Sequence, residues 1–285
     1  MHWRHATGVL PLDRPRILAI VNVTPDSFSD GGRLASIDDA RRLEDALIAD
    51  GADVIDIGGE STRPQGARPV TADEELRRVM PVVEAVLDDH PDIPVSVDTV
   101  KASIADRALR GGASIINDVS GFRLDAEMAH VCAKGGAGVV LMHSRGDVAD
   151  MATFAHATYG EDPVGEVVEE LRARVEEARQ AGIPDENIVV DPGIGFSKRS
   201  EHSLAALAQI GRVAAIGFPV LVGASRKRFI GEITSVKQPD ARAAGTVGAN
   251  VAALQRGAML FRVHDVKASR HALDVAWAIK QHDAP

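Results

Sequence analysis

The sequence is poor in cysteine and in long apolar runs, and each shortage excludes a class of protein. Its single cysteine, Cys132, cannot form an intrachain disulfide, which favours a reducing compartment. No run of about 18 apolar residues occurs, so we expect no membrane-spanning helix. Residues 1–15 are polar and lack the apolar centre of a secretion signal. These absences predict a cytoplasmic protein with no membrane partner.

Aromatic residues are also scarce, and acidic residues outnumber basic ones. Aromatic residues make up 4% of the 285 residues, so the core must be built from Val, Ile, Leu and Ala. The net charge of −9 argues against nucleic acid as a partner. An anionic substrate therefore needs a local group of cationic side chains. A hydrophobic content of 45% is nevertheless sufficient for a large buried core.

The motifs of several enzyme classes are missing as well. No Cys/His cluster suits zinc. The glycines after Asp191 are not followed by an acidic residue at the distance that a dinucleotide fingerprint requires, which excludes nicotinamide binding. Ser61 and Ser225 lack a His/Asp relay or a nucleophile elbow, so a serine hydrolase is not expected.

What the chain has is one pattern repeated eight times, an apolar run followed by a helical stretch. The apolar runs occupy residues 17–21, 54–58, 94–98, 113–118, 138–143, 187–191, 219–223 and 259–262. The predicted helices span residues 36–50, 71–89, 102–110, 125–134, 163–181, 202–214, 243–255 and 267–280. Pro81 is expected to kink the second helix.

This repeat predicts a single (β/α)8 barrel over residues 17–285, preceded by a short N-terminal segment, residues 1–16. The strands are continuous apolar runs, which is typical of a parallel sheet covered by helices. A doubly wound open sheet is the alternative fold.

Polar residues gather where the apolar runs end. In a barrel of this kind the carboxyl ends of the strands share one rim and form the active site. The side chains expected there are Asn22, Glu60–Arg63, Asp98, Asn117, His143, Asp191, Ser225–Arg228, Arg262 and His264. Each also has a structural explanation: a strand-end Asp often caps a helix, a basic run is often solvated, and His143 is more often a buried partner than a base.

The residue types at this rim suggest a substrate with two unlike parts. Asp98, Asn117 and Asp191 suit a flat heterocycle with amino and oxo edges. The cations Arg63, Lys227, Arg262 and His264 suit an anionic group such as a diphosphate. Asn22, Asp26 and Asp30 offer the oxygen ligands that Mg²⁺ prefers.

These motifs, taken in order, resemble those of dihydropteroate synthase, a family of pterin-binding enzymes. Residues 22–32 and 58–64 are similar to its two signature loops. Residues 96–99, 116–121, 191–196, 225–227 and 262–264 match its remaining motifs, so the resemblance covers about residues 17–264.

The resemblance implies that 6-hydroxymethyl-7,8-dihydropterin diphosphate condenses with 4-aminobenzoate, giving 7,8-dihydropteroate and pyrophosphate through an SN1-like pterin cation. It assigns Asp98, Asn117, Met142, Asp191, Lys227 and Arg262 to the pterin. It assigns Asn22, Arg63, Arg262 and His264 to the diphosphate, with Mg²⁺ on Asn22. It assigns Phe28, Thr62, Pro64, Phe196, Lys227 and Arg228 to the aminobenzoate. The residues expected to carry catalysis are Asn22, Arg63, Asp98, Lys227, Arg262 and His264.

The resemblance also implies a homodimer formed through helices late in the chain. One residue departs from the family pattern, because Gln65 separates Pro64 from Gly66. We expect this insertion to change loop closure over the aminobenzoate, and hence sulfonamide binding, more than catalysis. The alternative functions are a pterin-binding corrinoid methyltransferase domain, a non-catalytic pterin-binding paralogue, and an unrelated phosphate-binding barrel with Lys227 as a Schiff-base lysine.

Overall fold

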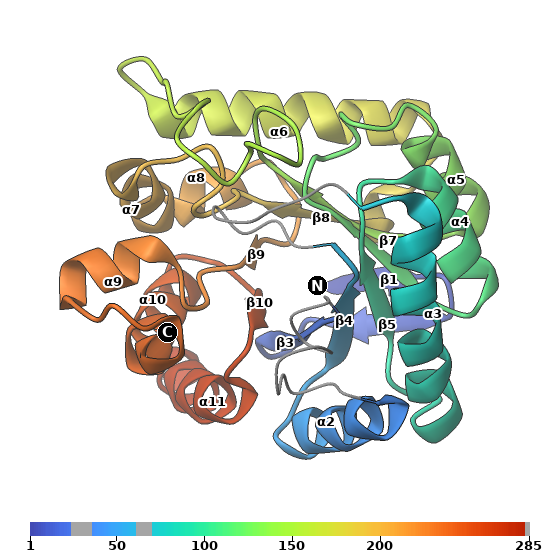
Figure 1. The fold of residues 1–285 in the computed structure, drawn as a ribbon. Helices are drawn as coiled ribbons and strands as arrows, with labels where there is room; N and C mark the ends of the chain where they lie inside the picture. Colours follow the sequence, from blue (N-terminus) through green and yellow to red (C-terminus); the bar gives the residue numbers. More distant parts are fainter. Residues whose placement is uncertain (24–35, 61–69, 283–285) are drawn as a thin grey trace.

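Eight parallel strands form the centre of the protein in a computed structural model that describes residues 1–23, 36–60 and 70–282 (Figure 1). They are β3 (Arg16–Asn22), β4 (Val54–Gly58), β5 (Val95–Asp98), β6 (Ile115–Asp118), β7 (Gly138–Met142), β8 (Ile188–Asp191), β9 (Leu221–Val222) and β10 (Leu260–Val263). The sheet order is β8-β7-β6-β5-β4-β3-β10-β9. A parallel bridge between Val190 and Val220 brings its two ends together. The predicted (β/α)8 barrel is confirmed, and the open sheet is wrong.

Helices surround the strands, as Figure 1 shows. They are α2 (Ile37–Ala49), α3 (Ala72–Asp89), α4 (Ala102–Arg110), α5 (Met128–Gly135), α6 (Pro163–Gln180), α7 (Ser200–Ala208), α8 (Ile210–Ala214), α9 (Arg228–Thr234), α10 (Ala243–Gln255) and α11 (Val266–His282). Two short 3-10 helices, η1 (Asp185–Asn187) and η2 (Pro239–Arg242), complete the described elements. Side-chain caps fix several starts, since Ser36 and Thr71 accept the N–H groups of Asp39 and Glu74.

Helix α3 spans its predicted residues and includes Pro81. Two other helical regions differ from the prediction. The helix predicted over residues 202–214 is divided at Gln209 into α7 and α8. Helix α9, which begins at Arg228 directly after the basic run, was not predicted.

A two-stranded hairpin, β1 (His2–His5) and β2 (Gly8–Pro11), closes the amino-terminal end of the barrel. Its Trp3 is fully buried and donates its indole N–H to the carbonyl of Asn187 at 2.8 Å. Trp3 and Leu10 form an apolar cluster with inward residues of seven strands: Leu18, Val54, Ile115, Val140, Val189, Leu221 and Leu260. This end of the barrel is therefore filled with apolar side chains, which leaves the carboxyl end for a binding cavity.

Among the described residues, no helix is long and apolar enough to cross a membrane.

Candidate active site

A cavity of about 780 Å³ opens at the carboxyl ends of the strands. Its lining includes all ten described residues that were assigned to the substrates or the metal: Asn22, Asp98, Asn117, Met142, Asp191, Phe196, Lys227, Arg228, Arg262 and His264. The remaining predicted site residues, Phe28, Thr62, Arg63 and Pro64, lie outside the described residues, as do Asp26, Asp30 and Gln65. The barrel therefore brings ten predicted side chains from distant parts of the chain to one cavity.

Arg262 on β10 connects two carboxylates at the base of this cavity. Its Nε donates to Asp56 at 2.6 Å, and its Nη2 donates to Asp98 at 2.7 Å. Asp56 has no exposed surface and also accepts the hydroxyl of Ser96 at 2.6 Å and the amide of Asn117 at 3.4 Å. Asp56 thus holds both Arg262 and Asn117 in place. Sequence reasoning missed it, although a carboxylate within the apolar run of residues 54–58 is an unusual feature.

Burial changes the charge balance of this group. It raises the pKa of Asp98 to about 7, because the attraction of Arg262 is partly cancelled by the nearby negative charge of Asp56. Burial alone would lower the pKa of Arg262. The two carboxylates raise it by more than burial lowers it, so the guanidinium stays protonated. The site therefore contains one permanent cation and one carboxyl group that titrates near neutral pH.

Asp191 ends β8 on another side of the cavity, with 4% of its surface exposed. Its Oδ1 accepts the N–H of Gly193 at 2.7 Å. Burial raises the pKa of Asp191, and the positive charge of Lys227 opposes that rise. Burial in turn lowers the pKa of Lys227 to about 8, against the attraction of Asp191. Lys227 also donates to the carbonyl of Ile194, with its Nζ 4.3 Å from the ring centre of Phe196.

Two unusual backbone conformations aim these side chains. Gly193 has φ +68°, and a Cβ at this position would come within 1.9 Å of the carbonyl oxygen of His143. Arg226 has φ +59°, a costly conformation for a side chain, and it is anchored by two hydrogen bonds to Asp265 of 2.6 and 3.0 Å. The anchored turn at Arg226 directs the next residue, Lys227, into the cavity.

Further cavity residues lie at the ends of β3, β9 and β10 and at the start of α9. Ser225 and His264 are joined by a contact of 3.0 Å between the hydroxyl and Nδ1, and the N–H of His264 donates to the same hydroxyl. The guanidinium of Arg228 lies 4.1 Å from the ring centre of Phe154. A Cβ built on Gly58 would lie 3.8 Å from Asn22 Oδ1 and 3.7 Å from Asp98 Oδ2, which places this glycine between the two cavity residues.

The sequence matches the family of pterin binding enzymes over residues 18–264. It is 44% identical over 255 residues to the dihydropteroate synthase of Bacillus subtilis, covering 90% of this chain and 85% of that protein. The chain belongs to the dihydropteroate synthase family. The predicted resemblance is thereby confirmed, and the protein is an enzyme of folate synthesis that transfers a dihydropterin-methyl group.

Solved structures of dihydropteroate synthases share its fold closely. The Xanthomonas albilineans enzyme in complex with 7,8-dihydropteroate is 41% identical, has a TM-score of 0.88 and is covered over the full length of both chains. The Yersinia pestis enzyme in complex with a sulfonamide drug is 38% identical, with a TM-score of 0.91 and coverage of 99% of this chain and 100% of that one. These relatives favour dihydropteroate synthesis over the corrinoid methyltransferase and the unrelated phosphate-binding barrel.

Within this dihydropteroate synthase, His143 lies behind the cavity lining rather than in it. Its side chain is 1% exposed and contacts Lys198 and Glu170, which agrees with the structural explanation given from the sequence. Lys198 is a second residue that sequence reasoning missed: it lines the cavity, yet only 2% of its surface is exposed. A lysine shortly after the 191–196 motif was the available signal.

Proposed function

We propose that this dihydropteroate synthase binds the pterin ring between Asp98, Asn117 and Asp191 and the diphosphate beside Arg262 and His264. The observation that carries the proposal is the arrangement of the cavity, in which buried carboxylates and an amide at the strand ends lie next to cationic side chains. A pterin diphosphate has the same two parts, a ring edge of N–H and C=O groups and an anionic tail.

The carboxylates suit the pterin for a geometric reason. Asp56 holds the Asn117 amide and the Arg262 guanidinium, so these groups meet the ligand in fixed orientations. Asp191 keeps one oxygen on the N–H of Gly193 and leaves its other oxygen for ring N–H groups. Met142, with Lys227 and Arg262, would pack around the ring.

In the proposed reaction the bond between the pterin methylene carbon and the diphosphate oxygen breaks first, and the electron pair leaves with the diphosphate. Positive charge then spreads into the reduced ring, where Asp98 and Asp191 stabilise it. The amine of 4-aminobenzoate attacks the carbon, and the resulting anilinium nitrogen loses one proton to solvent. The departing diphosphate is stabilised by Arg262, His264, Asn22 and Lys227. Arg63 is proposed to contribute as well. No covalent bond to the enzyme is required.

The aminobenzoate would lie toward the outer part of the cavity. Phe196 offers a ring face beside the Lys227 ammonium group. Arg228, at the first position of α9, provides a cation for the carboxylate. Phe28, Thr62 and Pro64 are proposed to complete this subsite. The expectation that Gln65 alters sulfonamide binding remains a prediction.

Magnesium fits the described site as a partner of the diphosphate. Asn22 lines the cavity and offers an amide oxygen. No group of three His, Cys, Asp or Glu side chains within residues 1–23, 36–60 and 70–282 could hold a metal. Because Mg²⁺ often binds through substrate phosphates and water with few protein ligands, we propose Asn22 as its protein ligand. When bound, the ion supplies positive charge at the leaving group.

We also propose a homodimer formed through helices late in the chain. Three large apolar side chains are exposed there: Ile233 on α9 and Val275 and Ile279 on α11, at 62%, 62% and 55%. Sedimentation of the purified enzyme should give twice the chain mass, and Ile279→Glu should shift it to the monomer. A monomeric wild type would contradict the proposal.

The cytoplasm is the proposed compartment. Cys132 is a buried free thiol whose pKa is raised by burial, so it is poorly suited to disulfide formation. Fractionation of cells that express the protein should recover it with cytoplasmic markers, and recovery with membranes or secreted protein would contradict this.

The deciding experiment is turnover of the purified enzyme with dihydropterin diphosphate, 4-aminobenzoate and Mg²⁺. Dihydropteroate and pyrophosphate should form in equal amounts and only when all three are present. Binding of the pterin diphosphate without turnover would instead support the non-catalytic pterin-binding paralogue.

A further inference from the structure

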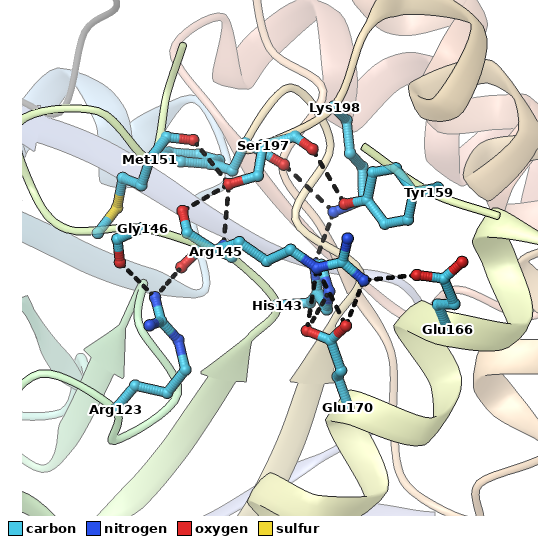
Figure 2. A network of polar contacts seen from close by, with 12 residues as sticks. Arg123, His143, Arg145, Gly146, Met151, Tyr159, Glu166, Glu170, Ser197 and Lys198 are labelled. Atoms are coloured by element: carbon cyan, nitrogen blue, oxygen red, sulfur yellow. Dashed lines mark hydrogen bonds and ion pairs between the residues drawn. The ribbon is translucent and has the colours of Figure 1, made fainter. Parts of the chain in front are cut away.

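Lys198 is a buried cation next to the cavity that the proposed reaction does not use. It follows β8 and lines the cavity, although only 2% of its surface is exposed. Its Nζ lies 2.7 Å from Nδ1 of His143 (Figure 2). It also donates to the carbonyl of Phe196 at 3.2 Å. Since an ammonium group has no acceptor capacity, Nδ1 of His143 must accept this hydrogen bond.

The other side of His143 connects this lysine to the protein surface. Its Nε2 lies 3.1 Å from Oε2 of Glu170 on α6, whose side chain is 41% exposed. The imidazole therefore carries its proton on Nε2 and donates to the carboxylate. Burial and the charge of Lys198 lower the pKa of His143 to about 4, so it stays neutral. Lys198, His143 and Glu170 thus form a continuous chain from the cavity to solvent.

Arg145 fixes the outer end of this chain. It donates to Glu166 at 2.7 Å and to Glu170 at 3.0 Å, and its guanidinium lies 4.2 Å from the ring centre of Tyr159 (Figure 2). The Tyr159 hydroxyl donates to the carbonyl of Ser197 at 3.0 Å. The segment between β7 and α6 therefore supports the residues around Lys198.

On the cavity side, Gly193 separates Lys198 from the Asp191 carboxylate, which is proposed to bind the pterin. The N–H of Gly193 is held by Asp191, and a Cβ on this glycine would lie 3.5 Å from Nζ of Lys198. Asp191 attracts the Lys198 ammonium group, and Lys198 in turn opposes the rise in the pKa of Asp191 that burial causes. The ammonium group therefore acts on the carboxylate from behind the glycine.

We propose that Lys198 is a positioning residue for pterin binding, whose ammonium group holds the turn that follows Asp191 through the Phe196 carbonyl and is itself supported by Glu170 through His143. The inference rests on the proposed pterin-binding role of Asp191. It predicts that a half-exposed glutamate on an outer helix controls the pH range over which the pterin binds.

The charges around Lys198 determine the direction of this effect. Burial lowers its pKa to about 7, Asp191 and Glu170 raise it, and Lys227 and Arg145 lower it further. The titratable or charged groups that face it from the packed elements are Asp191 of β8, His143 and Arg145 after β7, Tyr159 before α6, Glu170 of α6 and Lys227 before α9. Removing the negative charge of Glu170 should therefore cause Lys198 to lose its proton at lower pH.

The test compares Glu170→Gln with Glu169→Gln, a neighbouring change on α6. The Glu169 side chain is 78% exposed and pairs only weakly, at 3.7 Å, with Arg172. Calorimetric titration with dihydropterin diphosphate and Mg²⁺ is carried out between about pH 6 and pH 9. We expect Glu170→Gln to match the wild type near pH 6 and to bind about three- to tenfold more weakly near pH 8, because its Lys198 loses the proton at lower pH. Glu169→Gln should follow the wild type throughout.

Two changes at the lysine itself separate charge from packing. Lys198→Met should weaken pterin binding about tenfold near pH 6, whereas Lys198→Arg should bind well and no longer respond to Glu170→Gln. The inference is overturned if Glu170→Gln follows the wild-type pH profile, or if it weakens binding equally at every pH, as a merely structural role would. A wild type that binds no pterin at any pH would instead overturn the proposed function on which the inference rests.

Discussion

The two ends of the barrel contain similar ion networks that serve different purposes. At the amino end, Asp53 accepts hydrogen bonds from Arg14, Arg16 and Arg270 at 2.6, 2.9 and 3.3 Å, and from the N–H of Ile17. At the carboxyl end, a single guanidinium, Arg262, is shared by two carboxylates. The residue types are the same, but the ratio of carboxylates to guanidinium groups is reversed.

This reversal decides what each end can do. Around Asp53 every carboxylate oxygen has a protein donor, and the β1–β2 hairpin covers the neighbouring apolar cluster. At the other end, Asp98 and Asp191 line a cavity and have oxygens left for a ligand. A saturated network can only stabilise the fold, whereas an unsaturated one can also bind.

The largest expected effect lies at the saturated end. Asp53→Ala leaves buried guanidinium groups without their carboxylate, so we expect a loss of about 3–5 kcal/mol in the free energy of unfolding. Denaturant titration measures it, and turnover per folded molecule should not change. The control is Asp13→Ala, because Asp13 pairs with Arg16 but is 73% exposed and should cost about 1 kcal/mol or less. Equal losses in the two variants would contradict the comparison.

At the unsaturated end we expect a smaller effect, on pterin affinity rather than on the free energy of unfolding. Asp191→Asn replaces an acceptor oxygen by a donor that faces ring N–H groups, so pterin affinity should fall by about 1.5–3 kcal/mol, roughly ten- to a hundredfold. Calorimetric titration measures this loss. The free energy of unfolding should change little, because the burial of Asp191 already opposes its charge. Unchanged pterin affinity would remove Asp191 from the site.

Asp56 lies on β4, close to Asp53, which directly precedes that strand. A change at Asp56 therefore tests whether nearby positions on one segment separate the binding role from the stabilising role. Asp56→Asn keeps the shape but removes the charge that holds Arg262 and orients Asn117. We expect pterin and diphosphate affinity each to fall by about 1–2 kcal/mol. Titrations with the pterin diphosphate and with pyrophosphate measure the two losses. A loss confined to stability would place Asp56 with Asp53.

The rim was predictable because barrel geometry converts a sequence position into a place. Asp98 and Asp191 end apolar runs, and the carboxyl ends of parallel strands meet at one rim wherever the runs lie in the chain. Strand β9 was predictable in position but not in length. The apolar run 219–223 forms a strand of only two residues, since Pro219 has no N–H to donate to a neighbouring strand.

The supporting residues could not be found in this way. Asp56 lies inside an apolar run, and its partners come from β5, β6 and β10, which no local pattern connects. Lys198 has the same difficulty, because its partner His143 belongs to another strand end. The β1–β2 hairpin has only four residues per strand, and it is stabilised by the burial of Trp3 rather than by a periodic pattern.

The smallest expected effect concerns pH, and it shows that the rim loses stability in order to bind. The pKa of Asp98 is about 7 in the folded protein, above the 3.8 of the unfolded chain, so the folded state binds the proton more tightly. Its stabilising contribution is complete at acidic pH and is lost as the pH rises from about 4 through 7.

Between about pH 6 and pH 8 the free energy of unfolding should fall by roughly 1 kcal/mol more in the wild type than in Asp98→Asn. Denaturant titrations of both proteins at several pH values measure the difference, and parallel pH profiles would show that Asp98 is already ionised at pH 6. At the amino end we expect no loss of stability for the sake of binding, because three guanidinium groups donate to Asp53 whether or not a substrate is present.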